Sequence, residues 1–98
     1  MNRKEHLLVI LAEECNEVGQ RATKALRFGV NEIQPGTSNE NNAERLKYEY
    51  NDLIAIVEIL QEEGVLPPEM FSREMIDKKK ERVKYFLEYS KKIGTLQE

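Results

Sequence analysis

Three glutamates within five residues, Glu13, Glu14 and Glu17 in EECNE, form the stretch of this chain with the clearest chemical potential. With residues placed about 100° apart around a helix, Glu14 falls in the middle of the apolar stripe and Glu17 at its edge, whereas Glu13 points toward solvent. A second pair, Glu49 and Asp52 in EYND, falls on the apolar side of another helix. Each helix is therefore expected to place two carboxylates, three residues apart, on its packed side.

Four carboxylates in a partly desolvated place repel one another, or become protonated, unless a cation compensates their charge. Ligands that are all oxygen select hard divalent ions, so the pattern predicts a Mg²⁺ site that also accepts Mn²⁺. A buried salt-bridge network is the structural alternative, because Arg21 and Lys79 also fall on apolar stripes. One acidic motif arises easily by chance when 34% of residues are charged. Two such motifs, each on the apolar stripe of a long helix, favour the metal site.

The elements that must position these acids are helices, and the periodicity predicts an all-α chain. The first helix is expected from about Arg3 to Phe28. A second follows the cap Asn41 and runs to about Glu63, and a third follows the cap Ser72 and ends near residue 93. The connection over 29–41 exceeds the roughly 2–8 residues usual between helices, which leaves a functional loop and a merely flexible one as alternatives.

The composition limits the class of protein. Ninety-eight residues predict a single domain over 1–98. A net charge of −3 argues against a nucleic-acid partner. Cys15 is the only cysteine, so no disulfide framework exists and a reducing cytoplasm fits. No window approaches the roughly 20 apolar residues of a membrane span. We therefore expect a soluble cytoplasmic protein without a membrane partner.

EECNE followed by EYND resembles the EExxE…ExxD signature of the MazG-type, all-α nucleoside triphosphate pyrophosphohydrolases. The resemblance covers most of the chain, through EECNEVGQRATKALRFG, NNAERLKYEYNDLIAIVEIL and KKKERVKYFLEYSKKIG, which look like the short phage or bacterial members. It implies that Glu14, Glu17, Glu49 and Asp52 bind Mg²⁺ and that Glu13 supports them. One departure is the 31 residues between Glu17 and Glu49, more than is usual in that family, which leaves the substrate open.

The implied reaction cleaves a ribo- or deoxyribonucleoside triphosphate to the monophosphate and pyrophosphate with metal-activated water. Either Glu13 or Glu17 would orient or deprotonate that water. For the phosphate chain, Arg21 is well aimed, and Lys79 and Arg82 are the next candidates. The resemblance adds Lys24 near the pocket.

Three helices close a bundle poorly, and the second helix has an apolar arc too wide for one neighbour to cover. The family consists of dimers or dimers of dimers, so we expect an all-α bundle completed as a homodimer or homotetramer. The main competing interpretation is a non-catalytic helical interaction module whose acids form salt bridges. A di-iron bundle is disfavoured because His6 is the only histidine. A DNA-binding helix at KKKERVK is disfavoured by the acidic net charge.

Overall fold

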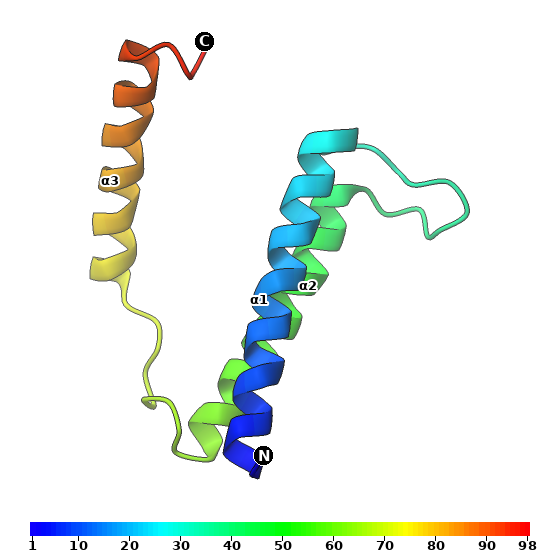
Figure 1. Ribbon diagram of the computed structural model, residues 1–98, viewed down its shortest axis with the longest axis vertical. Coiled ribbons are helices and arrows are strands. Elements are labelled where there is room, and N and C mark those ends of the chain that lie inside the picture. Colours follow the sequence, from blue (N-terminus) through cyan, green and yellow to red (C-terminus); the bar gives the residue numbers. More distant parts are fainter. The chain divides into compact units, whose positions relative to one another are not determined.

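The computed structural model describes all of residues 1–98 and contains three α-helices and no strand (Figure 1). Helix α1 spans Arg3–Phe28, α2 spans Asn42–Glu62 and α3 spans Arg73–Lys92. The predicted all-α class is confirmed, and each helix lies within one residue of its expected bounds. The chain divides into two compact units, Met1–Pro68 with α1 and α2, and Glu69–Glu98 with α3.

Short side chains at the helix starts explain why the bounds could be predicted. Asn41 accepts a hydrogen bond from the Glu44 amide at 2.9 Å, and the Glu44 carboxylate accepts one from the Asn41 amide at 3.2 Å. This is the expected capping box of α2. Ser72 Oγ accepts from the Met75 amide at 3.2 Å and caps α3, also as expected. Asn2 caps α1 in the same way, a cap not predicted from the sequence.

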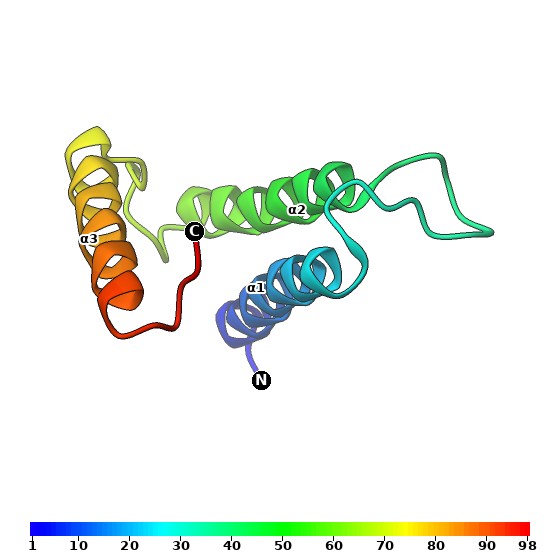
Figure 2. The ribbon, with the colours of Figure 1, turned by 90° about the horizontal axis from the view of Figure 1, so that it is seen from above.

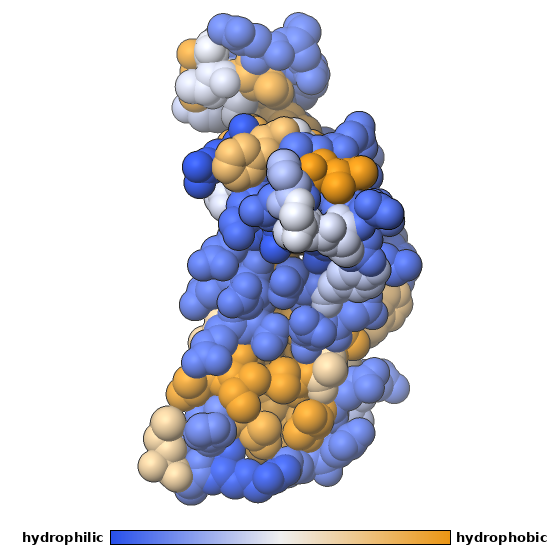
Figure 3. Space-filling view, turned by 90° about the vertical axis from the view of Figure 1, so that its right-hand side faces the viewer, coloured by the Kyte–Doolittle hydropathy of each residue, from blue (hydrophilic) through white to orange (hydrophobic).

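Helices α1 and α2 form an antiparallel hairpin, with the loop projecting beyond the end at which α1 stops and α2 starts (Figures 1 and 2). Its buried apolar side chains are Leu7, 8% exposed, and Leu60, 0% exposed. They lie near the start of α1 and the end of α2, so the core is concentrated at that end of the hairpin. Apolar surface remains uncovered toward the same end (Figure 3).

One side chain on the apolar stripe of α2 is not in the core. Tyr50 lies on the same stripe as Leu53 and Leu60, but it is 55% exposed. The residues of the same stripe that follow it, such as Leu53 and Ile56, are partly buried. A single neighbouring helix covers only part of a wide apolar arc, and Tyr50 falls outside the covered part.

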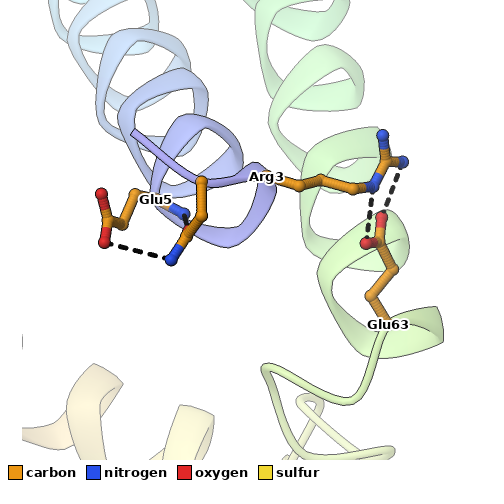
Figure 4. A network of polar contacts seen from close by, with 4 residues as sticks. Arg3, Glu5 and Glu63 are labelled. Carbon is orange, nitrogen blue, oxygen red and sulfur yellow. Dashed lines mark hydrogen bonds and ion pairs between the residues drawn. The ribbon is translucent and has the colours of Figure 1, made fainter.

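A bidentate ion pair joins the two helices at the end that holds the core (Figure 4). The Arg3 guanidinium donates through Nε and Nη2 to the two carboxylate oxygens of Glu63, at 2.8 and 2.9 Å. These hydrogen bonds lower the pKa of Glu63 and raise the pKa of Arg3. Because the pair is solvent-exposed, it orients the helix ends more than it stabilises the fold.

The opposite end of the hairpin is closed through the first residues of the loop. Asn42 is 3% exposed, and its Nδ2 donates to the Gly29 carbonyl at 2.8 Å. The Ala43 amide donates to the Val30 carbonyl at 3.2 Å. These two bonds hold the end of α1 against the start of α2. The buried Asn42 amide would be costly without a partner, so its bond to Gly29 favours this arrangement.

Helix α3 carries the ion pairs Arg73–Asp77 and Glu74–Lys78 along its first turns, at the spacing that favours helix formation. No side chain of α3 is buried. The apolar residues Val83, Phe86 and Leu87 are about half exposed. None of the three helices has the length and apolar character required to cross a lipid bilayer.

Leu60→Ala should reduce the free energy of unfolding by roughly 2–5 kcal/mol, because it leaves a cavity where the side chain is fully enclosed. Urea denaturation followed by circular dichroism measures the change. Leu26→Ala is the matched control, since Leu26 is 86% exposed, and it should change stability by less than about 0.5 kcal/mol. Equal effects of the two substitutions would contradict the placement of the core.

Candidate metal centre

Three of the four predicted metal ligands meet between α1 and α2. Glu14 comes from α1, and Glu49 and Asp52 come from α2, where they lie three residues apart and therefore on one face. One carboxylate oxygen from each lies within 4.8 Å of the others. Glu14 and Glu49 are partly buried, and Asp52 is exposed. The carboxylates therefore form a cluster with one side toward the hairpin interior and one side open to solvent.

The other two acids of EECNE lie beside this cluster and outside it. Glu13 and Glu17 are both exposed, and neither belongs to the group of mutually close carboxylates. Their negative charges nevertheless act on Glu14. Glu17, at the edge of the α1 stripe, is thus a neighbour of the cluster and is not in ligand contact with the other three.

The environment of Glu14 disfavours its charged form. Burial is the largest cause that raises the pKa of this carboxyl, followed by the charges of Asp52 and Glu49. Glu17 and Glu13 add smaller contributions in the same direction. Partial burial and like charges both destabilise a carboxylate, and the attraction of a nearby cation would offset both effects.

No basic side chain neutralises the cluster within its own unit. In the unit Met1–Pro68, the ion pair joins Arg3 to Glu63. It lies at the end of the hairpin that holds Leu7 and Leu60, away from the acidic cluster. Arg21, the basic residue on the same stripe of α1, forms no ion pair, and its Nε is shielded from solvent without a hydrogen-bond partner. In this unit the acids therefore lack the salt bridges that a purely structural network requires.

The donor set fits a hard divalent cation. All three groups are carboxylates, the ligand type that Mg²⁺ and Mn²⁺ prefer. Oxygens bound to one Mg²⁺ at about 2.0–2.1 Å are at most about 4.2 Å apart. The three oxygens lie within 4.8 Å of one another, which is close to that spacing. Glu14, Glu49 and Asp52 are the residues that could hold such an ion.

The predicted phosphate-binding residues fall into two groups. Arg21 and Lys24 lie on the last turns of α1, where they line a pocket of about 270 Å³. Lys79 and Arg82 lie on α3, in the second unit, and line a hollow of about 480 Å³ with Val83 and neighbouring apolar residues. Arg21 lies on the face of α1 that carries Glu14, Lys24 lies to the side of that face, and Lys79 and Arg82 share a face of α3.

Three polar residues that line the pocket beside Arg21 were not singled out from the sequence. They are Glu32 and Gln34 in the loop and Asn42 at the start of α2. No motif marks them. The unusual length of the loop was the one available signal, and it does not indicate which loop residues turn inward.

Comparisons with known proteins find no protein-family model, curated protein or solved structure that matches this chain. The arguments for a function are therefore the chemistry of the acidic cluster and the pattern of its residues.

Glu14→Gln should raise the melting temperature of the metal-free protein by a few degrees at neutral pH. Because the pKa of Glu14 is raised, its ionisation opposes folding. This opposition is absent below the ordinary pKa of 4.5. It grows between that pH and the raised pKa, and it is constant above the raised pKa. The difference between variant and wild type should therefore shrink below pH 4.5. Thermal melts in a chelator at several pH values measure it.

Glu58→Gln is the matched control for this substitution, because Glu58 is an exposed carboxylate on α2 outside the cluster. It should leave the melting temperature nearly unchanged across the same pH range. A loss of stability in Glu14→Gln at neutral pH would mean that the Glu14 carboxylate has a favourable partner, in contradiction to the geometry described above.

Proposed function

We propose that this chain is a Mg²⁺-dependent nucleoside triphosphate pyrophosphohydrolase of the MazG-like, all-α type. The observation that carries the proposal is the meeting of Glu14, Glu49 and Asp52 without a basic partner in their unit. A protein gains no stability from such a cluster, so a functional cation is the simplest reason for it. The resemblance of EECNE and EYND to the family signature supports the same conclusion.

The proposed reaction adds water across a phosphoanhydride bond. Bound Mg²⁺ would supply charge neutralisation for the phosphate oxygens and acidify water. Water oxygen forms a bond to the α-phosphorus while the bond from that phosphorus to the pyrophosphate oxygen breaks. Glu13 or Glu17 accepts the water proton, since both carboxylates are exposed beside the cluster. The products are the nucleoside monophosphate and pyrophosphate.

Basic residues beside the acids complete the proposed substrate site. Arg21 lies seven residues after Glu14, which corresponds to about 10 Å along the helix axis. Arg21 and Lys24 therefore lie on the side of the cluster that faces the loop, where they would bind anionic parts of the substrate. Lys79 and Arg82 on α3 are proposed as further phosphate-binding residues. A cytoplasmic location agrees with a nucleotide substrate and with the lone Cys15.

We further infer that the chain works as a homodimer or homotetramer. Apolar surface is exposed on the hairpin (Figure 3) and along α3, where Val83, Phe86 and Leu87 are about half exposed. An apolar surface of this kind in so small a protein favours association with a second copy.

Glu14→Gln and Asp52→Asn should each reduce pyrophosphate release by roughly 100-fold or more, because even the loss of outer-shell partners costs about 10–100-fold in metal sites. The assay compares ribo- and deoxyribonucleoside triphosphates with and without Mg²⁺. Circular dichroism should show unchanged helix content in both variants. Glu58→Gln is the control and should retain the wild-type rate, since Glu58 lies outside the cluster.

Calorimetric titration with Mg²⁺ and Mn²⁺ separates the enzyme from the alternative interaction module. The wild type should bind either ion, and Glu14→Gln should bind neither with comparable affinity. An absence of binding in the wild type, or full turnover in Asp52→Asn, would overturn the ligand assignment.

Size-exclusion chromatography with light scattering should give a mass of two or four times 11.5 kDa. The exposed apolar residues of α3 supply the physical reason, and Phe86→Glu should shift the population toward smaller species. A wild-type species at the monomer mass would refute the assembly.

A further inference from the structure

The pocket at the loop end of the hairpin differs in character from the acidic cluster. Its volume is about 270 Å³, slightly below the roughly 300–1,000 Å³ of sites that enclose a whole small molecule. Its walls come from the last turns of α1, from the loop and from the first residue of α2. The hydrogen bond from Asn42 to the Gly29 carbonyl holds the loop entrance in place. A pocket of this size suits one ring system rather than an entire triphosphate.

Two polar groups in the pocket walls lack partners. Arg21 Nε and Glu32 Oε2 are each shielded from solvent, and neither forms a hydrogen bond. No ion pair joins Arg21 to Glu32, although both residues line the pocket. Gln34 adds an amide that can both donate and accept. The pocket is therefore lined by a guanidinium, a carboxylate and an amide, of which Arg21 Nε and Glu32 Oε2 are themselves closed to solvent and the remaining polar atoms can face a single ligand.

Phe28 supplies an aromatic surface to the same pocket. The Arg27 guanidinium lies over the Phe28 ring at 4.5 Å from its centroid, which fixes the ring at the end of α1. Flat heterocycles stack on aromatic rings, and stacking alone does not distinguish one base from another. Any selectivity among bases must therefore come from the polar groups beside the ring.

We propose that this pocket holds the base of the nucleoside triphosphate and selects bases that carry an exocyclic amino group. This rests on the proposed function, because it assigns the substrate class of the same site. An ionised carboxylate only accepts hydrogen bonds, so Glu32 pairs with the amino group of cytosine, adenine or guanine. Uracil and thymine have a carbonyl oxygen in place of that amino group, and this oxygen would face the Glu32 oxygens.

The position of the pocket agrees with this assignment. Arg21 lines the pocket and lies on the same face of α1 as Glu14, about 10 Å away along the axis. The pocket extends along α1 from Arg21 to Phe28, about 10 to 21 Å from Glu14 along the axis, so a base seated at its Arg21 end leaves its sugar and phosphates nearest the acids. Lys24 also lines this pocket.

The decisive experiment compares dCTP with dUTP, because cytosine and uracil differ by an amino group against a carbonyl oxygen. The wild type should favour dCTP in kcat/KM by roughly tenfold or more, since a site built to pair with a polar group rejects an analogue that lacks it. Glu32→Gln should bring the ratio to within about threefold of unity, because an amide can donate to the uracil carbonyl as well as accept. It should do so mainly through a rise in kcat/KM for dUTP.

Glu40→Gln is the matched control. Glu40 lies in the same loop, but its carboxylate accepts hydrogen bonds from Ser38 and Tyr48 and does not line the pocket. The ratio of dCTP to dUTP turnover should stay at the wild-type value in this variant. An equal loss of selectivity in Glu40→Gln and Glu32→Gln would overturn the assignment to Glu32.

A second measurement separates this inference from the proposed reaction. Titration of the metal-free wild type with dCMP and dUMP, followed by nuclear magnetic resonance, should show tighter binding of dCMP with shifts at Phe28 and Gln34. If no triphosphate is hydrolysed, the proposed reaction fails and this titration alone decides the base pocket. If dCTP and dUTP are hydrolysed equally well, the base pocket is refuted and the reaction stands. Shifts confined to residues elsewhere would also refute the base pocket.

Discussion

The repulsion among carboxylates in the seam between α1 and α2 is the constraint on which the rest of the hairpin depends. Glu14 occupies a position on the packed stripe of α1 where an apolar side chain would strengthen the contact with α2. Glu49 and Asp52 face it from the other helix. Burial and these like charges raise the pKa of Glu14, so the middle of the seam opposes folding while it is ionised. The two ends of the hairpin must compensate.

Contacts at the two ends of the hairpin compensate for the repulsion in its middle. The end with Leu7 and Leu60 holds the buried apolar contacts, and Arg3 and Glu63 orient the helix ends there. The loop end is held by the buried Asn42, which bonds to the exit of α1. Between these anchored ends, the acidic cluster sits on two rigid helices. A site on such elements keeps its geometry better than one on loops, which the proposed metal binding would require.

The second unit contributes a helix of a different kind. Helix α3 has no buried side chain, and its apolar residues share a face with Lys79 and Arg82. An amphipathic helix of this composition gains stability by covering its apolar face, and its basic residues suit an anionic ligand. The apolar face of α3 fits the proposed oligomer, and its basic residues fit the proposed binding of phosphate groups.

The sequence alone determined the helices, the caps of α2 and α3 and the position of Glu14 on a packed face. Capping by Asn41 and Ser72 and the periodicity of apolar residues are local, so they can be read within a few residues. Only the tertiary structure decided that Glu17 lies outside the cluster, that Tyr50 is exposed, and that Glu32 turns into a pocket beside Arg21. Those outcomes depend on how α1 and α2 are rotated against each other and on where a long loop folds back. Both are set by contacts between residues distant in the chain, which no local pattern encodes.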